Sequence, residues 1–235
     1  MKVFLVGVGG GIGWSILKAL DSLGIETVTL SRSKELPELG HNTHISSDIV
    51  NVNAWKRVLG QHIEDITHVV YCSGAISPQK SFLKLSDKEL RRSFEVNFFG
   101  LLEVARSTIP YMRKDHNSKF VYLGTGASIR GYKGWSAYCT SKAASHMFIE
   151  CASLDHSDIG VKFIDINPGS VDTDMQLKIR EAKVNRVSKK LISEHNSPEF
   201  VAEFICKIIF LENNSIEDLY ISINNKAMVR KYFNG

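Results

Sequence analysis

The stretch Val3-Phe4-Leu5-Val6-Gly7-Val8-Gly9-Gly10-Gly11-Ile12-Gly13 determines the fold expected for this chain. An apolar run of strand character comes first, and five glycines within seven residues then lead into a helical pattern over Ile12–Leu23. Glycines between a strand and a helix permit a tight turn and a close approach of the backbone to a pyrophosphate, which the free N–H groups and positive end of the helix attract. The stretch therefore predicts a dinucleotide-binding turn, with a merely flexible turn as the alternative.

The same order of apolar run, turn and amphipathic segment continues along the chain. We expect strands over Val3–Val6, Glu26–Ser31, His44–Ser47, His68–Cys72, Phe120–Leu123, Val161–Ile166 and Leu219–Ile223, and helices over Ile12–Leu23, Asn53–Ile63, Asp87–Met112, Ser136–Leu154 and 198–211. Strands joined by long helices need crossover connections, which give a mostly parallel sheet covered on both faces. The pattern predicts a single α/β domain over residues 1–235, a doubly wound Rossmann fold with a mostly parallel seven-stranded sheet, helices on both faces and ligands at the carboxyl ends of the strands.

The composition excludes several classes of protein. With 43% hydrophobic and 23% charged residues the chain is an ordinary globular one, and no apolar run approaches the roughly 18 residues of a membrane span. The net charge of +4 comes without a dense basic block, so we expect no nucleic-acid partner. The four cysteines lack close CxxC spacing, which favours reduced thiols in a cytoplasmic protein over a zinc site or disulfides. We expect no metal.

The end of the second expected strand indicates which dinucleotide the fold would bind. A fold of this kind that binds NAD usually carries an acid there, for the ribose hydroxyls. This chain has Ser31-Arg32-Ser33 instead, and a guanidinium flanked by hydroxyls suits a 2′-phosphate. The stretch predicts NADP(H), with NAD(H) as the second choice. A solvated surface arginine is the alternative interpretation of Arg32.

The segment Tyr138-Cys139-Thr140-Ser141-Lys142 places a phenol and an ammonium four residues apart, on one face of a helix. A tyrosine normally ionises near pH 10, and a neighbouring lysine lowers that pKa. One such pair by chance is unsurprising among seven tyrosines, so a pair on a helix surface is the alternative. The position of the pair after a nucleotide-binding half, with Asn97 and Thr125 upstream, favours a site of proton transfer.

With these motifs in this order, the chain resembles the classical short-chain dehydrogenase/reductase family along nearly its whole length. The matching motifs are Gly7-x3-Gly11-Ile12-Gly13, Asp48-Ile49, Cys72-Ser73-Gly74, Val96-Asn97, Tyr138-x3-Lys142 and Asn167-Pro168-Gly169-x-Val171-x-Thr173. The order and spacing of all of them together exclude chance agreement.

The resemblance implies a role for each catalytic residue. Tyr138 would donate a proton to the carbonyl oxygen, and Lys142 would lower the pKa of Tyr138 and hold the nicotinamide ribose. Asn97 would position a water that continues the proton relay. Thr125 stands where the family has a substrate-orienting serine, and its hydroxyl can donate the same hydrogen bond. The expected cofactor-binding residues are Gly7, Gly11, Ile12, Gly13, Ser31, Arg32, Asp48, Ile49, Ser73, Gly74, Tyr138, Lys142, Pro168, Gly169, Val171 and Thr173.

The chain departs from the family's pattern at several positions. Val6 stands where threonine is usual, and Cys72 replaces an asparagine whose amide helps to hold the central strands together. Thr125 adds a methyl group and a fixed rotamer beside the substrate. The Asp-Gly-Gly ending that is common in the family is absent, so the oligomer contacts associated with it are less certain. The resemblance implies a homodimer or homotetramer.

The segment at about 174–197 takes the place of the family's substrate loop. It contains an excess of cations, which favours an anionic carbonyl or alcohol substrate, with a solvated helical lid as the alternative. Tyr132 and Trp135 would form a wall for an apolar or planar substrate, or Trp135 would pack beneath the loop. The sequence thus predicts an NADP(H)-dependent oxidoreductase that reduces a ketone or aldehyde, with Tyr138 as proton donor. An NAD-dependent alcohol dehydrogenase and a non-catalytic nucleotide sensor are the alternatives.

Overall fold

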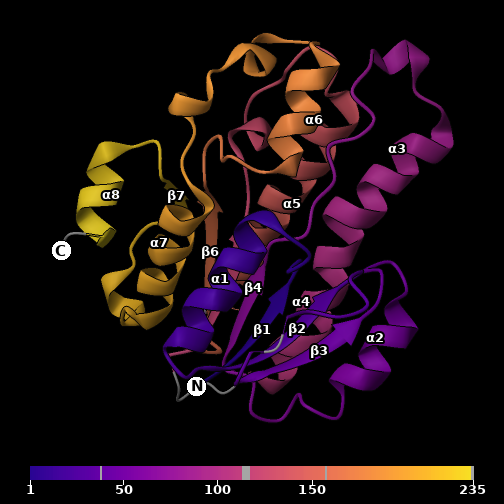
Figure 1. Cartoon of the computed structure of the whole chain (residues 1–235). Coiled ribbons are helices and arrows are strands. Elements are labelled where there is room, and N and C mark those ends of the chain that lie inside the picture. The colour runs from indigo at the N-terminus through magenta and orange to yellow at the C-terminus, as the bar shows by residue number, and fades with distance from the viewer. Residues whose placement is uncertain (38, 113–116, 157, 234–235) are drawn as a thin grey trace.

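A computed structural model describes residues 1–37, 39–112, 117–156 and 158–233, and its centre is a seven-stranded sheet (Figure 1). The strands are β1 (Lys2–Val6), β2 (Glu26–Ser31), β3 (Asn42–Ser46), β4 (His68–Tyr71), β5 (Lys119–Leu123), β6 (Lys162–Asn167) and β7 (Tyr220–Ser222). They lie in the order β3-β2-β1-β4-β5-β6-β7, and all neighbours are parallel. The chain winds outward from β1 in one direction and from β4 in the other, so the strand order reverses between them. The predicted fold class is confirmed.

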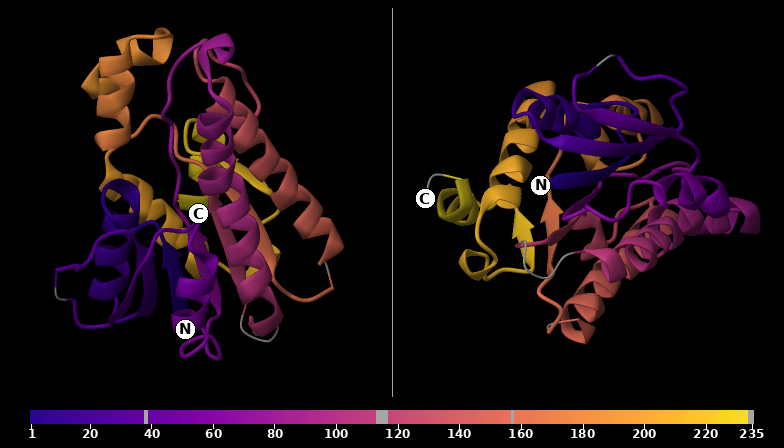
Figure 2. Two further views of the ribbon diagram at one scale, coloured as in Figure 1. Left: turned by 90° about the vertical axis from the view of Figure 1, so that its right-hand side faces the viewer. Right: turned by 90° about the horizontal axis from the view of Figure 1, so that it is seen from below.

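Helices cover the sheet on both faces. They are α1 (Gly11–Ser22), α2 (Val52–Leu59), α3 (Asp87–Phe94), α4 (Gly100–Thr108), α5 (Ser136–Asp155), α6 (Asp174–Ala182), α7 (Pro198–Phe210) and α8 (Lys226–Phe233). Successive residues of a strand point to opposite faces. Val3 and Leu5 of β1 therefore pack in one core with α1, α7 and α8, whereas Phe4 and Val6 pack in a second core with α2, α4 and α5. Figure 2 shows the helices on the two faces of the sheet. The central strands are consequently buried on both sides.

The long helix expected over Asp87–Met112 is interrupted. Helix α3 starts at a capping box, in which the Ser86 hydroxyl accepts from the Glu89 N–H, and Glu89 in turn accepts from the Ser86 N–H. A π-helical turn over Glu95–Phe99 then separates α3 from α4. A π turn inserts one extra residue into the helix, and such turns occur frequently at functional sites. This one contains Asn97.

Two further features concern the segments that follow β6 and β7. The segment expected as a substrate loop begins with α6, which stands above the carboxyl edge of the sheet in Figure 1. After the last strand the chain adds α8, whose Tyr232 is buried against the α1–α7 side and donates its hydroxyl to Asp218. None of the described helices is long and apolar enough to cross a membrane.

Candidate active site

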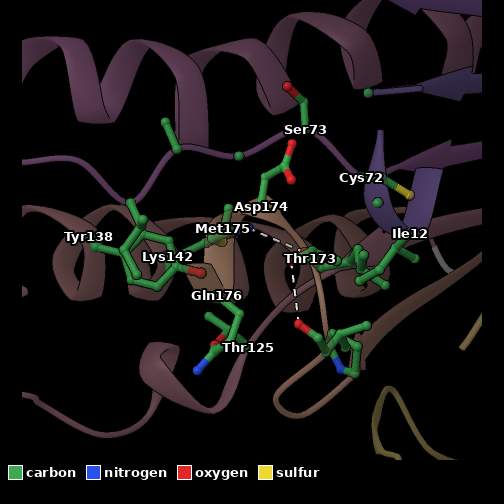
Figure 3. A pocket seen from close by; sticks show the side chains of 18 of the residues that line it. Ile12, Cys72, Ser73, Thr125, Tyr138, Lys142, Thr173, Asp174, Met175 and Gln176 are labelled. Carbon is green, nitrogen blue, oxygen red and sulfur yellow. Dashed lines mark hydrogen bonds between the residues drawn. The ribbon is translucent and has the colours of Figure 1, made fainter. Parts of the chain in front are cut away.

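A cavity of about 860 Å³ opens at the carboxyl ends of the strands. Loops after β1, β2, β4, β5 and β6 and the start of α6 surround it. All of the expected cofactor-binding residues line it, as do Thr125, Tyr138 and Lys142. In Figure 3, Tyr138, Lys142 and Thr125 lie on one side of the view and Ile12 and Cys72 on the other. Residues from distant parts of the sequence thus meet in one elongated space.

The glycine turn brings β1 and α1 into close contact. Gly7 has φ +100°, a conformation that favours glycine, and a Cβ on Gly13 would collide with the carbonyl oxygen of Gly7. Gly10 has φ +149°, and a Cβ built on it would meet open space within 4 Å. Among the described residues, no side chain caps the N-terminus of α1. The free N–H groups of α1 therefore face the cavity as a site for an anion.

The far end of the cavity carries positive charge. Ser31, Arg32 and Ser33 line it, and no carboxylate of the described residues forms an ion pair with Arg32. Asp48 is engaged elsewhere, since its carboxylate accepts from Arg92 at 2.7 Å and from the Val50 N–H at 3.2 Å. Burial opposes the ionisation of Asp48, but these hydrogen bonds and the charge of Arg92 leave its pKa below the ordinary value. Arg32 is thus available to a ligand.

Helix α5 presents Tyr138 and Lys142 on one face, where both side chains are buried yet line the cavity. Burial raises the pKa of Tyr138 to about 12, and a hydrogen bond with Thr125 opposes that rise. The Thr125 oxygen also accepts from the Ala127 N–H at 3.2 Å, which fixes the short turn after β5. Near neutral pH the phenol is protonated, which is the form that can donate a proton.

Lys142 lies deeper than Tyr138. Its Nζ donates to the carbonyl of Leu123 at 3.2 Å and stands 4.7 Å from the ring centre of Tyr122. Burial lowers the pKa of Lys142 to about 8, while the nearby charge of Asp165 acts to raise it. The ammonium therefore titrates close to the physiological range.

The structure places Asn97 behind the cavity rather than on its wall. The residue is fully buried, and its carboxamide exchanges two hydrogen bonds with the backbone of Ala75, at 2.7 Å and 2.9 Å. Its Nδ2 also donates to Ser141 at 2.9 Å, and its carbonyl accepts from Ser145 at 2.8 Å. In this arrangement Asn97 fixes the loop after β4 against α5.

The substrate side of the cavity is aromatic and cationic. Trp135 is 4% exposed and packs between Tyr132 and Tyr138, with ring centres 5.1 Å and 5.8 Å away. Its indole N–H donates to Gln79 at 3.0 Å. Trp135 therefore packs against residues of the 174–197 segment and also lines the cavity. Its contact with a substrate stays a prediction.

The cations of the 174–197 segment divide into two groups. Lys178, Arg186 and Lys190 line the cavity, whereas Arg180 lies 3.7 Å from the carboxylate of Asp172. Lys190 donates to the Ser170 hydroxyl at 3.0 Å. These cations give one part of the cavity rim a positive charge.

Sequence reasoning missed one buried pair near the site. Asp165 on β6 and His146 on α5 lie 2.6 Å apart through Oδ2 and Nδ1. The strand containing Asp165 is otherwise apolar, and no motif marks the pair. A buried acid within an apolar strand is the signal that points to it. In the part of the chain that the structure describes, no group of three or more His, Cys, Asp or Glu could hold a metal ion.

Comparisons of the sequence and of the fold with known proteins show what this chain is similar to. The sequence pattern described as short chain dehydrogenase matches residues 1–184. A benzil reductase ((S)-benzoin forming) of Bacillus cereus is 25% identical over 234 residues, which cover 89% of this chain and 94% of that protein. An uncharacterized oxidoreductase of Saccharomyces cerevisiae is 31% identical over 192 residues, 77% of this chain and 74% of its own length. In fold, a crystal structure of a short chain dehydrogenase/reductase from S. cerevisiae is similar with a TM-score of 0.85 at 24% identity, over 98% of this chain and 99% of the other.

Proposed function

This chain belongs to the short-chain dehydrogenase family, whose members bind a nicotinamide dinucleotide and act on CH–OH and C=O groups, and from that premise we propose that it reduces a ketone or an aldehyde with NADP(H). The observation that carries the proposal is the meeting of Thr125, Tyr138 and Lys142 in one cavity whose other end presents Arg32. A proton donor and a phosphate-binding cation then lie at the two ends of a single binding site.

The residues around the cavity fit a dinucleotide. The glycine turn leaves open space at Gly10 beside the uncapped start of α1, where a pyrophosphate would lie. Asp48 and Ile49 would contact the adenine, and Ser31 and Arg32 the 2′-phosphate. Ser73 and Gly74 after β4 and the Pro168–Thr173 segment after β6 would hold the nicotinamide half. When bound, the nicotinamide supplies the hydride for reduction.

Tyr138 acts as the proton donor in this proposal. Its raised pKa of about 12 keeps the phenol protonated near neutral pH, as carbonyl reduction requires. Thr125, which hydrogen-bonds with Tyr138, would donate to the developing oxyanion and orient the carbonyl. The ammonium of Lys142 would hold the ribose hydroxyls and stabilise the phenolate after proton donation. Asn97 would support both by holding the loop at Ala75 against α5.

The aromatic wall of the cavity supports a proposal for the class of substrate. Tyr132 and Trp135 offer flat apolar surface, and the relatives named benzil reductases act on an aromatic diketone by their names. We propose aromatic ketones as the first compounds to assay, with residues 174–197 as the substrate loop. The cations Lys178 and Arg186 on this loop would favour compounds that also carry an acidic group.

The proposal includes a homodimer or homotetramer in the cytoplasm. Apolar side chains of Phe99, Met147 and Leu154 are half or more exposed along the helices on the α4–α5 side, which supports self-association. The four cysteines are free thiols, which supports a reducing compartment. Light scattering during size-exclusion chromatography measures the mass of the particle in solution, and a monomer would contradict the proposed homodimer or homotetramer.

Replacement of Tyr138 by Phe tests the chemistry. The variant keeps the ring and its packing but loses the transferable proton, so NADPH-dependent turnover of an aromatic ketone should fall by about 10²- to 10⁴-fold. NADPH binding, measured as a rise in unfolding temperature, should stay unchanged. Tyr132→Phe, on the same wall, is the matched control and should retain turnover. Equal turnover in Tyr138→Phe and the wild type would exclude the mechanism.

Replacement of Arg32 by Asp tests the cofactor. Loss of the guanidinium and gain of an acid for the ribose hydroxyls should change the NADPH-to-NADH preference in kcat/KM by about ten- to a hundred-fold towards NADH. Arg57→Asp, an exposed change on α2 away from the cavity, serves as control. A preference for NADH in the wild type would favour the NAD-dependent alternative and leave the fold and the proton donor unaffected.

A further inference from the structure

A buried carboxylate lies beside the active site without belonging to any of its expected motifs. Asp165 is fully buried, and among the residues that the structure describes it is the only acid in the buried class. Its Oδ2 lies 2.6 Å from Nδ1 of His146, whose side chain is 15% exposed. His146 follows Lys142 by one turn of α5, so the two face the same side of that helix.

The second oxygen of Asp165 points to the active-site end of β5. A Cβ on Gly124 would collide with Oδ1, so this oxygen packs directly against the backbone of Gly124. Leu123 on one side of Gly124 accepts the hydrogen bond of Lys142, and Thr125 on the other side contacts Tyr138. The carboxylate therefore touches the short segment that positions both groups.

This oxygen also lacks a donor. Among the described residues, none donates a hydrogen bond to Asp165 Oδ1. An ionised oxygen in such a place is unfavourable unless a cation compensates it. Burial raises the pKa of Asp165, and the hydrogen bond and charge of His146, followed by the charge of Lys142, oppose that rise. Asp165 in turn raises the pKa of Lys142. The sheet register brings Asp165 next to Tyr122, whose ring lies beneath the ammonium.

We propose that Asp165, held in place by His146, is a positioning residue that keeps Lys142 charged and directed at Tyr138. The inference rests on the proposed function, since the charge of Lys142 affects turnover only if Tyr138 donates the proton. Asp165 touches neither cofactor nor substrate in this scheme; it acts through Lys142.

The other titratable groups around Asp165 and Lys142 do not supply the negative charge that Asp165 supplies. They are Cys72 from β4, Tyr122 from β5, Tyr220 from β7, and Tyr138 and Glu150 from α5. Burial raises the pKa of Cys72 to about 12 and also raises those of the three tyrosines, so these groups are neutral between pH 6 and 9. Glu150 is half-buried on α5, two turns from Lys142. Asp165 is thus the anion that acts on Lys142.

The test compares Asp165→Asn with the wild type in two titrations. Without the anion, the pKa of Lys142 should fall below about 8. The alkaline limb of kcat for NADPH-dependent ketone reduction should then move to lower pH by about one unit. Nitrogen-15 NMR of labelled lysine side chains follows the same ionisation without turnover, and Lys142→Met identifies the resonance. Glu150→Gln should change neither titration, and Lys119 is an internal control whose titration should stay the same.

A purely structural role for Asp165 predicts a lower unfolding temperature with both titrations unchanged, and that result in a folded variant would overturn the inference. If Asp165→Asn does not fold, His146→Phe provides the test. Removing the imidazole donor favours protonation of Asp165. The kcat–pH profile and the NMR titration of Lys142 should then shift in the same direction as in Asp165→Asn, by a smaller amount. If the wild type reduces no carbonyl compound, the proposed function fails, and the NMR titration still decides whether Asp165 controls Lys142.

Discussion

A buried lysine lies at each end of strand β5, and the surroundings of the two lysines differ. Lys119 is the first residue of the strand, and Lys142 of α5 donates to the carbonyl of Leu123, its last residue. Both are 3% exposed or less. Burial lowers both pKa values from 10.5 to about 8. The pKa alone does not distinguish the two ends of the strand.

The groups around the two lysines distinguish the two ends of the strand. Lys119 Nζ donates to the carbonyls of Asn117 and Ile209, both at 3.1 Å, and Ile209 lies in the last turn of α7. Carbonyls at a helix C-terminus lack partners within the helix, so Lys119 joins β5 to that terminus. Lys142 has a single carbonyl partner in the described structure and lines the cavity, which Lys119 does not. Both shifted pKa values reflect burial, whereas the adjoining cavity makes Lys142 the candidate functional residue of the two.

The largest difference between the ends is expected in turnover. Lys142→Met should reduce kcat for carbonyl reduction by about 10²- to 10⁴-fold, because the phenolate of Tyr138 loses its stabilising cation. Lys119→Met should leave kcat within about two-fold, because the residue lies at the opposite edge of the sheet. Steady-state kinetics with thermal unfolding of both variants measures this, and equal losses of kcat would remove the distinction drawn between the two lysines.

A smaller effect concerns stability at alkaline pH. The folded pKa of Lys119 is depressed to about 8, so above this pH the folded state has released a proton that the unfolded state keeps up to about pH 10.5. Stability from this group therefore increases as pH rises through that window. Between pH 8 and 10 the wild type should gain about 2 kcal/mol in unfolding free energy relative to Lys119→Met. Urea unfolding at several pH values measures the gain, and a constant difference would mean that Lys119 titrates normally.

The smallest effect is expected on the acid side, at His68. This residue pairs with Lys119 across β4 and β5, and burial, followed by the charge of Lys119, lowers its pKa from 6.5 to about 3. Below pH 6.5, His68 binds a proton in the unfolded state but not in the folded state, so the free energy of unfolding falls as the pH falls. From pH 6.5 to 5 the wild type should lose about 1.5 kcal/mol relative to His68→Gln. Parallel curves for the two proteins would contradict the prediction.

The sheet, and the grouping of the candidate site residues in one cavity, could be predicted because local patterns encode them. The seven apolar runs are short and separated by amphipathic segments, and all seven correspond to strands of the structure. Tyr138 and Lys142 are four residues apart on one helix, so the sequence alone puts them on one face. The role of these residues as donor and cation remains a prediction.

Other features depend on contacts that no local pattern encodes. The π turn over Glu95–Phe99 adds one residue to a helical repeat, and apolar spacing is too coarse to show it. Within that turn, Asn97 hydrogen-bonds with the backbone of Ala75 and does not line the cavity. Asp165 is a single acid in an apolar strand, and only the folded sheet brings it to His146 and Gly124. Helix α8 is short, and its Tyr232 became recognisable only through burial against the α7 side.

The five-residue length of β5 makes its two ends independent sites for engineering. Four steps along a parallel strand span about 13 Å, beyond the 7–10 Å within which substitutions usually couple. Stability changes from the Lys119 end and from the Lys142 end should therefore add. The Lys119 end of the sheet can then be redesigned, for instance to tolerate a different pH range, without changing the proton transfer proposed at the Lys142 end.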